Sequence, residues 1–212
     1  MIPFEVSTKK LVRVVLVTGI LLAILTLFVT NEATQKLDLS ILLFLKGARF
    51  PAFNELFLIL TYLGSVGFVS IATGCLGMIL FIKRKFDHLR LLLGAVAGSS
   101  LLVILLKEIV GRLRPEQLLA FYSETSFSFP SGHSSASVVF YGVMAYILAQ
   151  QFTDKKRRAN ILVGWIFFMA MIGFSRMYLG VHYASDVLGG YVIGFFSLSI
   201  AILLFEKYTV TK

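Results

Sequence analysis

Three clusters of polar residues interrupt an otherwise apolar sequence, and they hold the groups that could carry out chemistry. The clusters run from Lys107 to Pro115, from Phe129 to His133 and from Ser175 to Asp186. Charged side chains are costly to bury near a bilayer, so they usually mark a transport pathway or a site. The candidate site residues are Lys107, Arg114, Ser131, Gly132, His133, Ser175, Arg176, His182 and Asp186.

Together these residues supply three permanent positive charges, two histidines and one carboxylate, which suits a phosphoryl-transfer site. Charge is spread over the equatorial oxygens of a phosphoryl group during transfer, so positioned cations and N–H groups stabilise the transition state. Lys107, Arg114 and Arg176 are predicted to supply the cations. The backbone amides near Ser131 and Gly132 are predicted to point at the anion from the start of a helix.

The spacing of His182 and Asp186 predicts a hydrogen-bonded pair. They are four residues apart, so both lie on one face if a helix begins near Val181. A carboxylate that holds one ring N–H leaves the other ring nitrogen unprotonated, as a nucleophile or base requires. Spacing alone leaves open whether His182 or His133 is the attacking group.

Each of these residues also has a purely structural explanation when it is taken singly. Lys107 could anchor a helix end by reaching the membrane interface, and Arg114 before Pro115 could simply end a helix. Ser131 and Gly132 are also typical of a turn with a helix cap. The conjunction of all three clusters on one side of a membrane is what favours a functional site.

A zinc site is the competing interpretation of the same residues, because two histidines and an aspartate suit zinc. The same pocket would also hold three permanent cations, which repel a divalent ion. The sequence therefore favours chemistry that uses no metal and no other cofactor.

The composition indicates which elements position these groups. The 212 residues are 58% hydrophobic and 15% charged, which is typical of a membrane protein rather than a soluble domain. We predict an all-α, polytopic membrane protein with one domain over residues 1–212. Short interfacial helices are expected over residues 31–62 and a loop over residues 108–130. Six transmembrane helices are expected at about 12–30, 64–82, 89–107, 134–151, 159–176 and 187–205.

Two pairs of glycines four residues apart predict close helix packing. Gly94 and Gly98 form the first pair, and Gly190 and Gly194 form the second. Small residues let helix backbones approach closely where no hydrophobic effect draws helices together.

The net charge of +9 arises from short basic clusters at the ends of the apolar stretches, so we expect no nucleic-acid partner. With both termini in the cytoplasm, thirteen of the twenty lysines and arginines fall on the cytoplasmic side. That excess predicts a multi-pass protein of the cell membrane with its active site on the extracytoplasmic face. The thirteen residues are Lys9, Lys10, Arg13, Lys83, Arg84, Lys85, Arg90, Lys155, Lys156, Arg157, Arg158, Lys207 and Lys212.

The three clusters form the ordered motifs K-x6-R-P, P-S-G-H and S-R-x5-H-x3-D, which extend from Lys107 to Asp186. In this pattern the chain resembles the type 2 phosphatidic acid phosphatase superfamily, and every motif position is filled. The resemblance implies a lipid phosphatase that acts without a metal. Its small bacterial members imply phosphatidylglycerophosphate, undecaprenyl pyrophosphate or phosphatidic acid as the lipid phosphate substrate.

The resemblance also implies a role for each residue. His182 would attack phosphorus to give a phosphohistidine, Asp186 would support it, and His133 would protonate the departing lipid oxygen. Water would then hydrolyse the intermediate. The residues that would hold the phosphate are Lys107, Arg114, Ser131, Gly132, Ser175 and Arg176.

Two alternative functions use the same residues. A phosphotransferase would pass the phosphate from His182 to a second acceptor, and the sequence leaves this open. A non-catalytic transporter would only bind anionic lipid headgroups, but the polar mid-span residues and internal repeat typical of transporters are not found. The sequence also leaves open which lipid is preferred and the oligomeric state.

Overall fold

The computed structural model describes residues 7–116 and 119–210, and within them the chain is helical with no strand. Lys212, one of the residues assigned to the cytoplasmic side, lies outside the described residues. The helices are α1 (Thr8–Phe28), α2 (Glu32–Gly47), α3 (Pro51–Leu63), α4 (Val66–Ile82), α5 (Phe86–Val110), α6 (Gly132–Ala149), α7 (Lys155–Tyr178) and α8 (Ala184–Val210).

Five helices, α1 and α5 to α8, are long and apolar enough to cross a membrane. Helices α3 and α4 pass the same test only together and are bent by 48° at the break between them, so they make a sixth span if the bent pair counts as one. Each of the six predicted stretches coincides with a helix to within a few residues, and residues 31–62 form α2 and most of α3. The predicted all-α, multi-pass fold is therefore confirmed.

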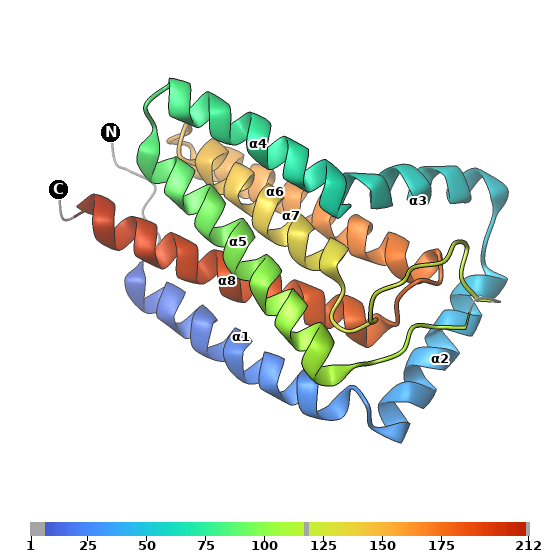
Figure 1. Ribbon diagram of the computed structural model, residues 1–212. Coiled ribbons are helices and arrows are strands. Elements are labelled where there is room, and N and C mark those ends of the chain that lie inside the picture. Colours follow the sequence, from blue (N-terminus) through green and yellow to red (C-terminus); the bar gives the residue numbers. More distant parts are fainter. Residues whose placement is uncertain (1–6, 117–118, 211–212) are drawn as a thin grey trace.

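The two ends of the bundle differ in character (Figure 1). One end holds the start of α1, the end of α8, and the tight connections from α4 to α5 and from α6 to α7. The other end holds α2, α3 and the long connection between α5 and α6, which is the predicted loop. Apart from Lys212, the basic residues assigned to the cytoplasm lie at the first end, and the three motif clusters lie at the second.

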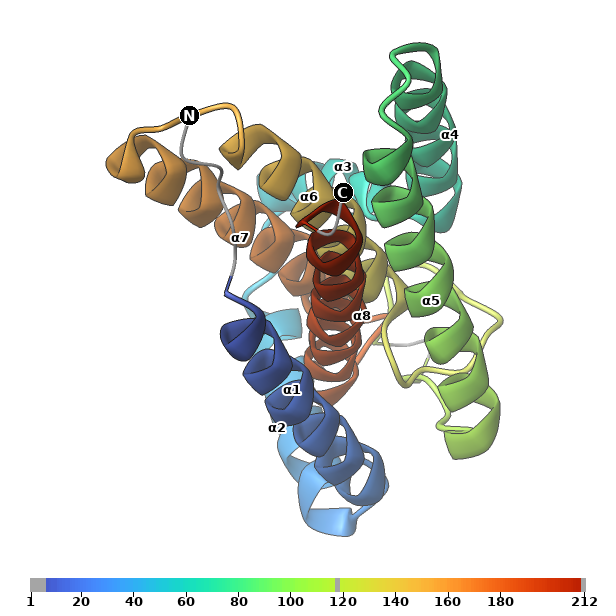
Figure 2. The same cartoon turned by 90° about the vertical axis from the view of Figure 1, so that its left-hand side faces the viewer.

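Helix α8 lies near the centre of the bundle, with α1 and α5 on either side of it (Figure 2), and α6 also packs against it. At the crossing of α6 and α8, a Cβ on Gly190 would lie 2.4 Å from the carbonyl oxygen of Ser131, and one on Gly194 would lie 2.5 Å from the Cβ of Val138. No larger residue fits there without a shift of the backbone, so the prediction for this glycine pair is confirmed.

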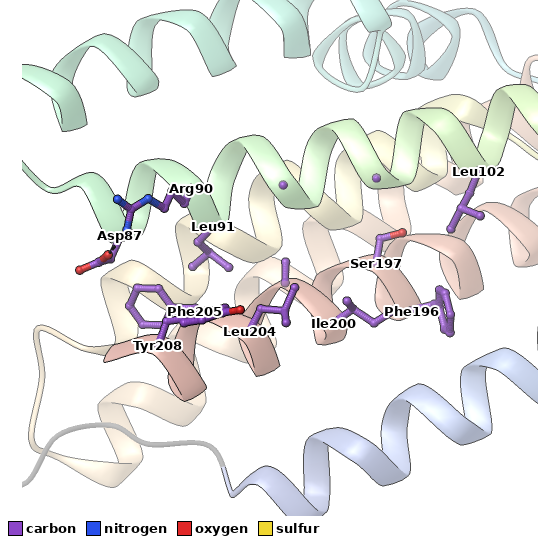
Figure 3. Close-up of a pocket in the computed structure, with 13 residues that line it drawn as sticks. Asp87, Arg90, Leu91, Leu102, Phe196, Ser197, Ile200, Leu204, Phe205 and Tyr208 are labelled. Carbon is purple, nitrogen blue, oxygen red and sulfur yellow. Dashed lines mark hydrogen bonds and ion pairs between the residues drawn. The ribbon is translucent and has the colours of Figure 1, made fainter. Parts of the chain in front are cut away.

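The prediction for Gly94 and Gly98 is wrong. A Cβ on either residue would meet nothing within 4 Å. Both glycines instead line an apolar groove of about 430 Å³ between α5 and α8, which Phe196 and Ile200 also line (Figure 3). The missing side chains here leave room along the helix instead of bringing two backbones together.

Candidate active site

The three motif clusters meet at the end of the bundle that lies away from the termini. The amide of Ser131 donates to the backbone carbonyl oxygen of Asp186 at 2.9 Å, which ties the start of α6 to the start of α8. The Lys107 ammonium near the end of α5 donates to the carbonyl oxygen of Phe127. Contacts between residues far apart in the sequence thus gather the clusters into one site.

His182 lies in the turn before α8, so the prediction that a helix begins near Val181 is wrong. The amides of Val181 and His182 donate to the carbonyl oxygen of Arg176 and so close the end of α7. Gly180, with φ of +74°, supplies the left-handed conformation that this closing turn requires. Helix α8 begins only at Ala184, because residues that still cap one helix cannot start the next.

The predicted pair forms nevertheless. Nδ1 of His182 lies 3.3 Å from Oδ2 of Asp186, and both side chains are buried. The same carboxylate oxygen accepts a hydrogen bond from the amide of Tyr183 at 2.9 Å. Asp186 therefore caps the first turn of α8 and holds the imidazole from the same position.

The hydrogen bonds of His182 indicate which of its nitrogens carries the proton. Nη1 of Arg114 lies 3.2 Å from Nε2 of His182, and a guanidinium can only donate. Nε2 must therefore accept, which leaves the proton on Nδ1. Nδ1 donates a hydrogen bond to the carboxylate of Asp186. Burial lowers the pKa of His182 to about 4, although Asp186 acts to raise it, so the ring is neutral at neutral pH.

Asp186 has a donor for each of its carboxylate oxygens. Nη1 of Arg112 donates to Oδ1 at 2.6 Å. The hydroxyl of Ser128 donates to Oδ2 at 2.5 Å and also lies 3.4 Å from Nδ1 of His182. A buried carboxylate is costly unless it is fully hydrogen-bonded, and this one is held in a fixed orientation by its donors.

Arg114 reaches the site from the loop after α5. Its Nε donates to the carbonyl oxygen of Ser126 at 2.7 Å, and its Nη1 donates to that of Val181 at 2.8 Å. These bonds fix the plane of the guanidinium beside His182. Nη2 lies 3.5 Å from a carboxylate oxygen of Glu124.

Arg176, near the end of α7, is completely buried. It donates to the hydroxyls of Thr61 and Tyr122, and its Nη2 lies 2.5 Å from Oε1 of Glu124. Its Nε has no hydrogen-bond partner within the described part of the chain. Burial raises the pKa of Glu124, but Arg176 and Arg114 lower it by more, so an ionised carboxylate bridges the two arginines.

The two motif serines are already engaged. The hydroxyl of Ser175 donates to the carbonyl oxygen of Ile172 at 2.5 Å within its own helix. The Ser131 side chain is the N-cap of α6 and accepts from the amide of Ser134 at 3.4 Å. The first two amides of α6, those of Gly132 and His133, have no partner of their own within the helix, as at any helix start.

His133 lies in the first turn of α6, and Arg176, Arg114, Lys107 and His182 are all near enough to affect its charge. The two histidines are therefore on the same side of the bundle and belong to one cluster of cationic side chains. In the part of the chain that the structure describes, no three His, Cys, Asp or Glu side chains are grouped so that they could hold a metal ion.

Sequence reasoning missed several residues around the candidate groups. Arg112, Glu124 and Ser128 contact candidate side chains directly, and Asp38 contacts Arg112. Arg112 lies inside the first motif, at one of its unspecified positions. Asp38 is four residues before Leu42, on the apolar and buried face of α2. An acidic residue on such a face would have indicated a buried charge that needs a partner. Glu124 and Ser128 lie in an irregular loop and have no comparable pattern.

Comparisons with known proteins identify the family of the chain. A model of the PAP2 superfamily matches residues 88–209. The chain is 38% identical over 176 residues to phosphatidylglycerophosphatase B of Bacillus subtilis, which covers 81% of this chain and 84% of that protein. It is 34% identical over 118 residues to the lipid A 1-phosphatase of Rhizobium etli, covering 51% of this chain and 47% of that protein.

Two solved structures resemble the fold. A transmembrane PAP2-type phosphatidylglycerolphosphate phosphatase from Bacillus subtilis matches with a TM-score of 0.79 and 31% identity, over 93% of this chain and 96% of that chain. LpxE of Aquifex aeolicus matches with a TM-score of 0.63 and 30% identity, over 78% of this chain and 94% of that chain. This chain therefore belongs to the PAP2 superfamily, as a multi-pass membrane lipid phosphatase.

Proposed function

We propose that this protein removes phosphate from a membrane lipid by covalent catalysis on His182. The observation that carries the proposal is the orientation of the imidazole. Nδ1 of His182 is held by Asp186, while its unprotonated Nε2 faces the guanidinium of Arg114. A nucleophile beside a phosphate-binding cation, supported by a carboxylate, is the arrangement that phosphoryl transfer requires.

The phosphate is proposed to bind where Glu124 now bridges Arg114 and Arg176. A phosphate presents more charge and more acceptor oxygens than a carboxylate, so it competes well for both arginines. The Nε of Arg176, which has no partner among the described residues, offers one further donor. Lys107, Ser131, Gly132 and Ser175 complete the proposed binding set, with the first amides of α6 directed to the anion by the helix dipole.

The proposed reaction has two steps. Nε2 of His182 attacks phosphorus, the bond to the lipid oxygen breaks, and His133 gives its proton to that oxygen. Asp186 stabilises the positive charge that develops on the His182 ring. Water then attacks the phosphohistidine, His133 takes a proton from the water, and inorganic phosphate leaves with His182 restored. The proposed mechanism uses no metal, because the arginines of the proposed phosphate site supply the positive charge.

A lipid is proposed to reach this pocket sideways from the bilayer. A cavity of about 150 Å³ lies between α4, α5 and α6, and it is lined by apolar side chains such as Val66, Val103 and Ile104 as well as by Gly132 at the start of α6. An acyl or isoprenoid chain in this cavity would place its phosphate at the helix start. The distribution of basic residues supports an extracytoplasmic active site with both termini in the cytoplasm.

We propose phosphatidylglycerophosphate as the preferred substrate, because the Bacillus subtilis relative named for that activity is similar over most of both chains. The test is a competition assay with purified protein in detergent. Phosphatidylglycerophosphate, phosphatidic acid and undecaprenyl pyrophosphate are offered together with a chelator, and products are identified by mass. Phosphate release, with phosphatidylglycerophosphate consumed fastest, is expected. A phosphorylated second acceptor would indicate a phosphotransferase, and binding without turnover would contradict the proposal.

The dependence of rate on pH is a further prediction. His182 must be neutral to attack, and its pKa of about 4 is below the ordinary value. The acid limb of kcat/KM is therefore expected below about pH 5, rather than near the unperturbed histidine pKa of about 6.5. A bell-shaped profile is expected, because the phosphate must hold His133 protonated as the acid while His182 stays neutral.

The measurement is kcat/KM from acid to alkaline pH with two substrates, a lipid monophosphate and a lipid diphosphate. The second ionisation of a phosphate monoester has a pKa of about 6, so a limb that changes with the substrate belongs to the substrate. The limbs common to both substrates belong to the coupled site. A flat profile would contradict a mechanism that divides the work between two histidines.

A further inference from the structure

We infer that Asp38 and Arg112 are positioning residues of the active site: the buried chain Asp38–Arg112–Asp186 sets the negative charge that Asp186 presents to His182. The inference rests on the proposed role of His182 as the nucleophile. It adds helix α2, which lies outside the three motifs, to the machinery that supports the reaction.

The chain is continuous and buried. Nη2 of Arg112 lies 2.7 Å from Oδ2 of Asp38, and Nη1 lies 2.6 Å from Oδ1 of Asp186. The side chains of Asp38, Arg112 and Asp186 are exposed by only 3%, 6% and 0%. One guanidinium therefore joins two carboxylates that are 148 residues apart in the sequence. The two nitrogens of its fork point to different carboxylates, which the single ammonium of a lysine could not reproduce.

Ser185 locks the same arrangement from the start of α8. Its amide donates to Oδ1 of Asp38 at 3.0 Å, and its hydroxyl donates to Oδ2 of Asp38. Nη1 of Arg112 in turn donates to the Ser185 hydroxyl at 2.7 Å. The ring of Tyr183 lies 4.3 Å from the guanidinium carbon of Arg112. The chain is thus fixed next to the two residues of the catalytic pair, and it is not a loose surface ion pair.

The three residues Asp38, Arg112 and Asp186 come from separate elements, so only the tertiary structure brings them together. Asp38 comes from α2, Arg112 from the loop after α5, and Asp186 from the first turn of α8. Asp38 points inward with the buried Leu42 on the same face of α2. An ionised carboxylate there is costly unless it has a partner, and Arg112 provides the partner.

The charges explain what the chain does for catalysis. Arg112 alone would neutralise Asp186 and leave little negative charge to stabilise a cationic imidazole. Asp38 neutralises Arg112 instead, so the three groups together carry one net negative charge. Burial disfavours the charged form of Arg112, but Asp186 and Asp38 more than offset this and raise its pKa, so it stays charged.

Charged groups from several elements lie near His182, and each of them contributes to the pKa of its imidazole. Asp186 supplies the negative charge from α8, and Glu124 supplies a second from the loop after α5. Arg176 on α7, Arg114 in the loop and His133 on α6 supply or can carry positive charge. Arg112 contacts Asp186 and Asp38 contacts Arg112, so both can be changed without removing a proposed phosphate-binding group.

The test uses Asp38→Asn, Arg112→Gln and the double variant in the full-length protein. Asp38→Asn leaves Arg112 uncompensated, so the pKa of His182 should fall and kcat should drop about tenfold with little change in KM. Arg112→Gln leaves an additional negative charge, so the acid limb of kcat/KM should move up by about one pH unit. The double variant restores one net negative charge, and its acid limb should return to the wild-type position.

Asp87→Asn is the matched control, because it breaks an ion pair of 2.8 Å with Arg90 near the opposite end of α5. It should leave the rate and the pH profile unchanged. Thermal unfolding in the same detergent separates a loss of fold from a loss of charge. If all the variants keep the wild-type acid limb and lose activity only in proportion to stability, the chain is purely structural and the inference is overturned.

If Arg112→Gln fails to fold, Asp38→Asn tests the inference alone. Asn has the size of Asp, so this variant removes the charge with the least change in packing. A wild-type kcat and acid limb in that variant would also overturn the inference. His182→Ala is assayed in parallel. If His182→Ala remains active, the proposed nucleophile is wrong. If His182→Ala is inactive while Asp38→Asn behaves as wild type, only the charge chain is wrong.

Discussion

Replacing His182 by alanine is expected to reduce phosphate release by at least about 10⁴-fold, because the loss of a covalent nucleophile removes the whole reaction path. The remaining cations should still bind the substrate, so KM should change much less than kcat. The measurement is inorganic phosphate released from a lipid phosphate in detergent. A phosphorylated enzyme trapped by alkaline quenching should form in the wild type and be absent from the variant.

The histidine outside the proposed site, His88, provides a matched control. His88 lies at the start of α5, near the opposite end of the bundle, and its Nε2 is 3.1 Å from Oε1 of Gln150. His88→Ala should retain nearly full activity. Near-normal turnover by His182→Ala would show that another group attacks phosphorus, even if the substrate still binds.

Replacing Arg176 by lysine is expected to lower kcat/KM by about 10²- to 10³-fold although the charge is retained. The guanidinium reaches Thr61, Tyr122 and Glu124 at the same time and offers Nε for a further oxygen. A lysine has one ammonium group on a flexible stem and cannot reproduce that planar set of donors. Most of the loss should be in kcat, because charge on the phosphoryl oxygens is greatest in the transition state.

Arg90→Lys is the control for this substitution, since Arg90 forms an exposed ion pair with Asp87 far from the pocket. It should change kcat/KM by less than about twofold, as expected for an exposed pair. A loss of less than tenfold in Arg176→Lys would mean that its charge alone matters and that the geometry of its donors does not. Thermal unfolding of both variants identifies any part of the loss that comes from folding.

The fold was largely predictable because each span has to be apolar over its own length. The stretches predicted for α1 and for α4 to α8 all became helices, and the predicted loop separates α5 from α6. Glycine was less informative. Gly190 and Gly194 lie at a tight crossing, whereas Gly94 and Gly98 line a groove, and nothing in the spacing distinguishes these two outcomes.

The site was predictable as a set of residues but not as a geometry. The motifs identify His182 and Asp186, yet the start of α8 at Ala184 depends on how α7 ends, which involves the turn at Gly180. Glu124 and Ser128 were missed because irregular loops follow no periodic pattern. Glu124 contacts two arginines and Ser128 contacts the carboxylate of Asp186, so tertiary contacts decide where both residues lie. The roles assigned to the motif residues and the single-domain organisation stay predictions.

By itself the sequence determined that the protein lies in a membrane, where its helices are and which residues carry chemistry. Hydropathy, motif spacing and side-chain chemistry are local properties, so each can be found without the fold. Only the tertiary structure decided which charges face each other. Asp38, Arg112 and Asp186 come from three elements, and each would be an isolated and costly buried charge without the others. A Coulomb interaction depends on distance and burial, and neither can be read from separation along a chain.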